Sequence, residues 1–75
     1  MKIQLKLMGV LKSRTPEGGS IELADGSSVE DALRALAIES ASVQVFTVNG
    51  SLERNRARVL EEGDELSVIP PVGGG

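Results

Sequence analysis

The chain of 75 residues contains no cysteine, histidine, tryptophan or tyrosine, and Phe46 is its only aromatic residue. Without cysteine there is no disulfide framework, no thiolate zinc site and no cysteine nucleophile. Without histidine the chain lacks the commonest general base and the commonest metal ligand. We therefore expect no metal site and no catalytic machinery of its own, because only Asp, Glu, Lys and Ser remain for such chemistry.

A surplus of positive charge is also missing. Eight basic against eleven acidic residues give a net charge of −3, whereas nucleic-acid-binding domains usually carry a basic surface and often aromatic stacking platforms. No apolar run is long enough to span a bilayer, and residues 1–7 alternate instead of forming the apolar core of a secretion signal. These absences predict one small cytoplasmic domain that binds neither nucleic acid nor a membrane.

What the chain does contain is apolar alternation with period two, which is typical of half-buried strands. This pattern predicts strands at residues 2–8, 20–24, 43–48 and 65–69, with a further short strand near Leu52. Residues 13–19 are rich in turn formers and predict the connection of a first antiparallel hairpin. Asn49 and Gly50 form a hairpin turn signal, and residues 60–64 predict another turn, in which Gly63 is free to adopt a positive φ.

One amphipathic helix is expected between the second and third strands. Helical apolar spacing begins at Val29 and continues for about ten residues. Either Ser28 with Asp31 or Ser27 with Glu30 could form its N-terminal capping box. A helix that joins two halves of one sheet crosses it and covers one face. The sequence therefore predicts an α+β roll, in which one helix packs across one face of a mixed sheet of four to five strands.

The last six residues, Pro70-Pro71-Val72-Gly73-Gly74-Gly75, cannot pack as a regular element. We assign residues 1–69 to the domain and residues 70–75 to a flexible tail. One interpretation of this tail is a frayed terminus. The other is chemical: glycines leave only backbone to enter a narrow enzyme site, so that the α-carboxylate itself can react, while the prolines hold the tail clear of the domain.

In the order of its motifs the chain resembles the ubiquitin-like sulfur carriers of the MoaD/ThiS family, and the resemblance covers nearly all 75 residues. Its most specific part is the Pro-Pro-Val-Gly-Gly-Gly ending. The other parts are residues 28–31 at the start of the helix, residues 48–50 after the third strand and residues 60–66 before the last one. The resemblance implies the β-grasp fold of ubiquitin.

The resemblance also implies a carrier rather than an enzyme. A ubiquitin-activating-type enzyme would use ATP and Mg²⁺ to adenylate the carboxylate of Gly75, with Gly74 allowing close approach of the backbone. The carboxylate would then become a thiocarboxylate that donates its sulfur. The carrier would bind no cofactor and would be a monomer on its own. Its second partner would be a sulfur-accepting synthase, either the large subunit of molybdopterin synthase or a thiazole synthase.

Several recipients of the sulfur are compatible with the ending. Pro70-Pro71-Val72 resembles the small subunit of molybdopterin synthase, which favours the molybdenum-cofactor pathway. Gly73 stands where that subunit often carries alanine, and it also suits the thiamine-pathway carrier. A cysteine-biosynthesis carrier, a modifier conjugated to lysines and a plain β-grasp binding module stay open. A stand-alone hydrolase is disfavoured because no motif arranges Ser, Asp and Lys for catalysis.

A partner-docking surface is expected on the sheet face that the helix does not cover. Alternation over residues 43–48 gives two apolar sets, and at least one of them must point away from the helix. We predict that Phe46 and Ile69 dock the partner together with Pro71, Val72 and Gly73 of the tail. The alternative is that Phe46 fills the core.

Two charged clusters accompany these apolar residues. The acidic cluster at residues 61, 62, 64 and 65 could meet basic residues of the activating enzyme, although a solvated turn is the simpler interpretation. Arg54, Arg56 and Arg58 are interpreted as a charged loop, since three arginines are too few for a nucleic-acid patch.

Overall fold

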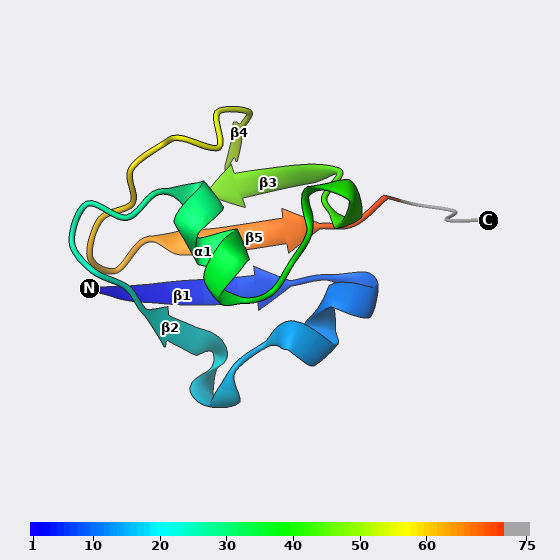
Figure 1. Ribbon diagram of the computed structural model, residues 1–75, viewed down its shortest axis with the longest axis horizontal. Coiled ribbons are helices and arrows are strands. Elements are labelled where there is room, and N and C mark those ends of the chain that lie inside the picture. Colours follow the sequence, from blue (N-terminus) through cyan, green and yellow to red (C-terminus); the bar gives the residue numbers. More distant parts are fainter. Residues whose placement is uncertain (72–75) are drawn as a thin grey trace.

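The computed structural model describes residues 1–71 and contains one sheet and one α-helix in that range (Figure 1). The α-helix and the strands follow the predicted order along the chain. Their bounds are β1 (Lys2–Leu7), β2 (Ser20–Glu22), α1 (Val29–Ala35), β3 (Val45–Val48), β4 (Ser51–Glu53) and β5 (Glu65–Ile69), with the short 3-10 helices η1 (Gly9–Arg14), η2 (Glu17–Gly19) and η3 (Ser40–Ser42).

The sheet is mixed and has the strand order β2-β1-β5-β3-β4. Its two central strands, β1 and β5, pair in parallel although they come from opposite ends of the sequence. The pairs β1–β2, β3–β4 and β3–β5 are antiparallel. The helix lies across one face of this sheet (Figure 1). The prediction of a mixed sheet with one helix across one face is therefore confirmed.

Helix α1 begins at the first of the two capping boxes that the sequence offered. The side-chain oxygen of Ser28 accepts from the backbone N–H of Asp31, and the Asp31 carboxylate accepts from the backbone N–H of Ser28 at 2.9 Å. Both bonds satisfy donors that have no partner within the helix. The Asp31 carboxylate also accepts from the Ser28 hydroxyl at 3.2 Å. The bond from the Ser28 backbone N–H, followed by the one from the hydroxyl, holds the pKa of Asp31 below its usual value.

The helix is shorter than predicted because it stops in a Schellman motif. Ala37 adopts a left-handed φ of 59°. The N–H of Ala37 then donates to the carbonyl of Arg34, and the N–H of Ile38 donates to the carbonyl of Leu33. These two bonds satisfy the last helical carbonyls and turn the chain away from the helix axis. The apolar spacing that continued to Leu36 therefore extends past Ala35, the last residue of α1.

The hydrophobic core lies between α1 and the sheet face that carries the odd-numbered residues of β1. Residues that pair across the ladder share this face, such as Leu7 with Val68 and Phe46 with Val68. The buried apolar residues are Ile3, Leu7, Leu11, Val29, Ala32, Leu33, Leu36, Ile38, Phe46, Val48, Leu60, Leu66 and Val68.

Within residues 1–71, no α-helix covers the opposite face of the sheet. Strand alternation places Ile69 on this face opposite Val45, and Thr47 opposite Leu52. Ile69, Val45 and Thr47 are half-buried, and Leu52 is exposed. The apolar set that points away from the helix is thus the set with Val45 and not the one with Phe46.

Candidate functional site

The C-terminal segment leaves the domain at the end of a central strand. Strand β5 ends at Ile69, whose carbonyl accepts from the N–H of Gln44 at 2.8 Å. On the other side, the N–H of Met8 donates to the carbonyl of Val68 at 3.1 Å. Pro70 and Pro71 have no N–H, so the ladder cannot continue through them. The chain therefore leaves the sheet between β1 and β3, at the right-hand end of the view in Figure 1.

A close backbone approach sets the direction of this exit. Gly9, the first residue after Met8, has a left-handed φ of 55°. A Cβ atom at this position would lie 3.1 Å from Cγ of Pro70. Only glycine therefore fits here without a shift of the proline ring. The ring of Pro70 therefore lies close to the backbone of Gly9.

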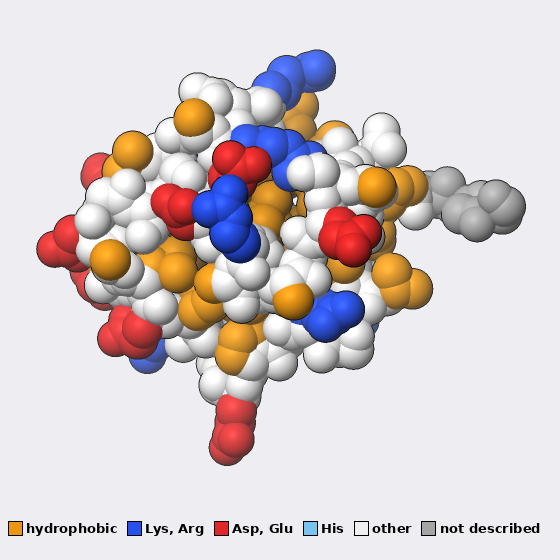
Figure 2. Space-filling view, viewed as in Figure 1, with side chains coloured by type: hydrophobic (Ala, Val, Ile, Leu, Met, Phe, Trp, Pro, Cys, Tyr) orange, Lys and Arg blue, Asp and Glu red, His pale blue; other side chains and the backbone are white. Residues whose placement is uncertain are grey.

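Five uncharged residues lie together at the point of exit. Gly9, Val10, Ser42, Pro70 and Pro71 line one shallow hollow, and we call these five residues the tail-base surface. Val10 is 81% exposed, more than Leu52 and Val59, which are each 55% exposed. Figure 2 shows apolar side chains gathered beside the residues drawn in grey. Val10, the most exposed of these three side chains, thus lies beside Pro70 and Pro71, which we call the stem of the tail.

The predicted site residues divide between described and undescribed parts of the chain. Gly75, Gly74, Gly73 and Val72 lie outside the described residues. Pro71 is exposed at the tail base, and Ile69 is on the uncovered sheet face, out of phase with Leu66 and Val68 as predicted.

The prediction that Phe46 lies on an exposed docking surface is wrong. Its side chain is only 4% exposed and belongs to the core cluster. The physical reason is register: Phe46 pairs with Val68, and both side chains point toward α1. The Arg56 guanidinium lies over the Phe46 ring, 6.0 Å from its centre. Phe46 therefore fills the core, which was the alternative interpretation.

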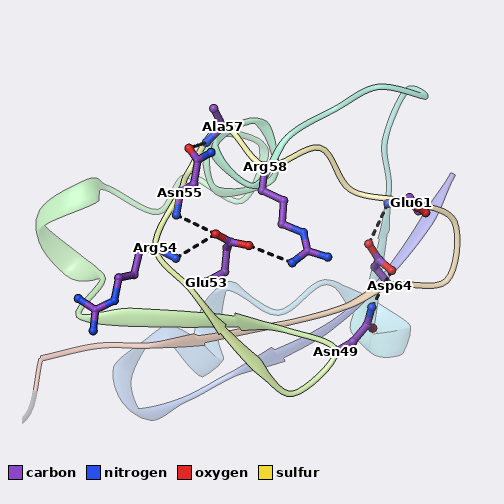
Figure 3. A network of polar contacts seen from close by, with 8 residues as sticks. All are labelled: Asn49, Glu53, Arg54, Asn55, Ala57, Arg58, Glu61 and Asp64. Carbon is purple, nitrogen blue, oxygen red and sulfur yellow. Dashed lines mark hydrogen bonds and ion pairs between the residues drawn. The ribbon is translucent and has the colours of Figure 1, made fainter.

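The acidic cluster at residues 61, 62, 64 and 65 lies at the start of β5, at the opposite end of this strand from the tail. Asp64 accepts from the side-chain amide of Asn49 and from the backbone N–H of Glu61, both at 2.9 Å (Figure 3). Glu62 accepts from the backbone N–H of Lys2 at 3.0 Å. Two members of the cluster thus hold turns together. These bonds support the interpretation of the cluster as a solvated turn rather than as a docking site.

The arginine loop is organised around one carboxylate. Glu53 accepts from the Arg58 guanidinium at 2.9 Å and from the backbone N–H groups of Arg54 and Asn55 at 3.1 and 3.0 Å (Figure 3). The bond from Arg58, followed by the one from Asn55, lowers the pKa of Glu53. The charge of Arg58 is therefore matched within the loop. Arg54 and Arg56 border a hollow next to Phe46 and Leu52.

Residues 1–71 were also compared with the requirements of a metal site and of a membrane-spanning helix. Within this range, no group of three or more acidic side chains is placed to hold a metal ion. No helix in the described part of the chain is long and apolar enough to cross a membrane.

The sequence reasoning missed Gly9 and Val10 as parts of the site. Glycine directly after a predicted strand was a usable signal for a close approach of two chain segments. Nothing in the sequence pattern distinguished Val10 from its apolar neighbours Met8 and Leu11, because its exposure depends on the turn of η1.

Comparison with known proteins relates this geometry to one family. A model described as the ThiS family matches residues 5–75. A Chlamydomonas reinhardtii protein named molybdopterin synthase sulfur carrier subunit is 34% identical over 83 aligned positions, covering 97% of this chain and all of that protein.

Solved structures agree on the fold. SAMP1 from Haloferax volcanii superposes with a TM-score of 0.74 at 26% identity, with complete coverage of both chains. A putative molybdopterin converting factor subunit 1 from Pyrococcus furiosus gives a TM-score of 0.75 at 22% identity, covering 96% of this chain and 99% of that one. A complex of subunits 1 and 2 of molybdopterin-converting factor from Helicobacter pylori matches at a TM-score of 0.59 and 23% identity, over the full length of both chains. With its β-grasp fold and a family match over residues 5–75, the chain belongs to the ThiS family of ubiquitin-like sulfur carriers.

Proposed function

We propose that this chain carries sulfur as a thiocarboxylate on Gly75. A carboxylate oxygen of Gly75 attacks the α-phosphorus of ATP and releases pyrophosphate, which leaves an acyl-adenylate. A sulfur nucleophile at the oxidation level of hydrosulfide then attacks the acyl carbon and expels AMP. The products are the thiocarboxylate, AMP and one proton. Activation as the adenylate is needed because an ionised carboxylate is a poor acyl donor.

The observation that carries this proposal is the family match, which extends to residue 75 and so includes the glycines. Two further observations support it. The segment follows a central strand and a two-proline stem, which suits delivery of the terminus to another protein. The chain has no cysteine or histidine for chemistry of its own. We therefore place the base, the Mg²⁺ and the ATP site on an adenylating partner and propose that the chain itself is no enzyme.

Recognition by partners would involve the end of the domain where the tail leaves. We propose that residues 1–69 form the domain, and that Ile69, Pro71, Val72 and Gly73 contribute to partner docking, with Gly74 giving close backbone approach at the reacting centre. Ile69 suits this role because it lies half-buried on the uncovered sheet face beside the stem. An ATP-dependent step would take place in the cytoplasm.

For the recipient of the sulfur we favour molybdopterin synthase, with this chain as its small subunit. The Chlamydomonas relative supports this choice through its name and its 34% identity. The two-subunit complex from Helicobacter pylori gives a precedent in the same fold for a large-subunit partner. The second candidate is a modifier conjugated to lysines, which the likeness to SAMP1 at 26% identity favours, because the protein in a second Haloferax structure is named small archaeal modifier protein 1. Thiamine- and cysteine-pathway carriers, and a plain binding module, are outcomes of the tests below.

The first test is adenylation in vitro. The full chain and a variant lacking Gly75 are incubated with ATP, Mg²⁺ and the ubiquitin-activating-type enzyme of the same organism. We expect carrier-dependent exchange of pyrophosphate into ATP with the full chain and none with the variant. Equal melting temperatures would show that the deletion leaves the domain intact. Exchange that is equal with both chains, or absent with both, would contradict the proposal.

The second test identifies the recipient. Deletion of the gene should abolish molybdoenzyme activity, and the wild-type gene should restore it while the variant lacking Gly75 should not. A requirement for thiamine or cysteine instead would redirect the proposal to the corresponding pathway. Isopeptide linkage of Gly75 to lysines, found in tryptic digests of cell extracts, would favour the modifier.

A further inference from the structure

We infer that Asn49 is a deamidation site, that hydrogen bonds to the start of β5 restrain its reaction in the folded chain, and that the product weakens this contact. Asn49 directly precedes Gly50. Because glycine has no side chain, its backbone nitrogen can approach the preceding side chain closely. Asparagine is a thermally labile residue for this kind of chemistry. The reaction needs only the chain and water, so the inference does not depend on the proposed function.

Deamidation at such a position begins within the chain. The backbone nitrogen of Gly50 attacks Cγ of Asn49, and a new bond forms between these two atoms. The bond from Cγ to Nδ2 breaks, and ammonia leaves with the proton that the Gly50 nitrogen loses. Water then opens the resulting succinimide at one of its two carbonyl carbons, which gives aspartate or isoaspartate at position 49.

Both polar atoms of the Asn49 side chain are engaged in the folded chain. Nδ2 donates to Oδ1 of Asp64 at 2.9 Å (Figure 3). Oδ1 accepts from the backbone N–H of Glu65, also at 2.9 Å. We call these two hydrogen bonds the Asn49 clasp. Nδ2 cannot leave as ammonia unless its bond to Asp64 is broken, so the clasp has to open before the reaction is complete.

The partner side of the clasp is held by bonds of its own. Oδ2 of Asp64 accepts from the backbone N–H of Glu61 at 2.9 Å, and the N–H of Asp64 donates to the carbonyl of Glu61 at 3.0 Å. The carbonyl of Asp64 accepts from the N–H of Gln4 at 2.9 Å. These three bonds fix Asp64 between the turn before β5 and strand β1. Asn49 is therefore bound to a well-positioned acceptor.

The surroundings of Gly50 provide no comparable restraint. Gly50 is exposed. Its two chain neighbours aside, no atom of residues 1–71 lies within 4 Å of its Cβ position. Neighbouring atoms therefore do not shield this turn from water, and the clasp is the feature that holds the reaction back.

The product replaces a hydrogen-bond donor with an acceptor. A carboxylate at position 49 cannot donate to Asp64, and it places a second negative charge beside the first. Within residues 1–71, the ion pairs do not include Asp64, and like charges at this distance repel. The clasp cannot re-form in the same way. Deamidation thus loosens the contact between the β3–β4 hairpin and the start of β5.

The first experiment measures the deamidation rate of the full chain at neutral pH, folded in buffer and unfolded in guanidinium chloride. Trypsin releases residues 35–54, which contain Asn49 and no other asparagine. Mass spectrometry of this peptide detects the exchange of NH2 for OH, and fragment ions locate it. We expect folding to slow the reaction about tenfold or more, which corresponds to about 1.4 kcal/mol for opening the clasp.

Two aspartate variants separate the clasp from general stability. Asp64→Ala removes the acceptor of the Asn49 amide. Asp31→Ala is the matched control, because each carboxylate also accepts from a backbone N–H, that of Glu61 or that of Ser28. Both are incubated under conditions in which urea unfolding shows them to be folded. We expect Asp64→Ala to raise the rate about tenfold and Asp31→Ala to react as the wild type does.

A second experiment mimics the product. Asn49→Asp should lower the melting temperature by roughly 5 °C or more, because it removes one bond to a charged group and adds a repulsion. Asn55→Asp is the control. Its Oδ1 only accepts, from the backbone N–H of Ala57 at 3.0 Å, and a carboxylate can do the same. We expect this variant to melt close to the wild type.

Each result supports or overturns the inference. Equal rates for the folded and unfolded wild-type chain would overturn it, and this comparison stands without any variant. A folded Asp64→Ala chain that reacts no faster than Asp31→Ala would also overturn it, because the restraint would then not come from the clasp. An Asn49→Asp chain that melts with the wild type would contradict the loss of the contact.

Discussion

At the scale of single residues, the close approach of Gly9 and Pro70 shows how the backbone freedom of a glycine can make room for a proline ring. A Cβ atom at position 9 would lie 3.1 Å from Cγ of Pro70. The residue that carries it would also have to keep a φ of 55°. The steric clash depends on the ring of Pro70, whereas the backbone strain at position 9 does not. The two effects can therefore be separated by experiment.

We predict that Gly9→Ala destabilises the domain by more than the strain of its φ alone. The strain is reported by Gly19→Ala, since Gly19 has a φ of 71° and nothing within 4 Å of its Cβ position; that variant should lose about 1 kcal/mol. In a Pro70→Ala background, which removes Cγ, the cost of Gly9→Ala should fall by about 0.5–1 kcal/mol. Urea unfolding of the four variants of this cycle measures the coupling, and strictly additive losses would disprove the contact.

Phe46 gives a second prediction at this scale. Phe46→Ala should cost about 3–5 kcal/mol, out of a total of about 4–11 kcal/mol expected for a domain of this length. Phe46→Asp should unfold the protein outright, because it would bury an unpaired charge. Circular dichroism reports the outcome. Leu52→Asp, at a position 55% exposed, is the control and should remain folded. A folded Phe46→Asp variant would contradict the assignment of Phe46 to the core.

Residue roles were the part of the site that the sequence could define least. Alternation over residues 43–48 gave two apolar sets of nearly equal weight, and only the pairing of Phe46 with Val68 decides between them. That pairing joins residues 22 positions apart in the chain, so no local pattern contains it. Ile69 was placed correctly because its phase relative to Leu66 and Val68 is a local property of one strand.

At the scale of elements, both ends of α1 are governed by local hydrogen bonds. At the N-terminus the folded state lowers the pKa of Asp31 from its ordinary value of 3.8, mainly through the bond from the Ser28 backbone. A carboxyl whose pKa is lower in the folded than in the unfolded state stabilises the fold above its unfolded pKa, and this stabilisation is lost as the pH falls through the folded pKa.

The capping box therefore predicts a pH-dependent effect of Asp31→Asn. The variant should be less stable than the wild type at neutral pH. The difference should shrink as the pH falls from about 4, where the carboxyl of the unfolded chain becomes protonated, through the lower pKa of the folded state. Ser28→Ala should cost about 1 kcal/mol at neutral pH. Urea unfolding at several pH values gives both results. A difference between the Asp31 variant and the wild type that does not change with pH would contradict this account.

At the C-terminus of α1, Ala37 holds a position that glycine usually fills. Its φ of 59° strains a residue with a Cβ atom. Ala37→Gly should relieve this strain and stabilise the domain by about 0.5–1 kcal/mol, after the loss due to the freer unfolded chain. Thermal unfolding measures the change. A lower melting temperature would show that the strain is already relaxed or that the methyl group packs usefully.

Elements were predictable where short-range rules dominate. The strand at residues 65–69, the turn at Asn49 and Gly50, and the cap at Ser28 all depend on neighbours within a few positions. The segment between β1 and β2 was predicted only as a turn, whereas it forms η1 and η2. Its geometry depends on burial of Leu11 in the core and on the contact of Gly9 with Pro70, both of which are long-range.

At the scale of the whole molecule, the sheet separates two functions between its ends. Strand β5 begins among acidic side chains that hold turns together and ends in the stem of the tail. The reacting group that we propose could be named from the sequence because it belongs to the glycines at the end of the family match. The tail-base surface could not be predicted, since it joins residues from η1, η3 and the two prolines, which only the folded chain brings together.

The central claim is that Gly75 becomes a thiocarboxylate, and intact-mass spectrometry of the chain isolated from its native host tests it most directly. The account predicts a population heavier than the unmodified chain by the exchange of one oxygen for one sulfur, located on the C-terminal fragment and removed by an alkylating reagent specific for thiocarboxylates. The variant lacking Gly75 should not show this population. A wild-type chain that carries only an ordinary carboxylate, in cells that are actively making the sulfur-containing product, would contradict the account.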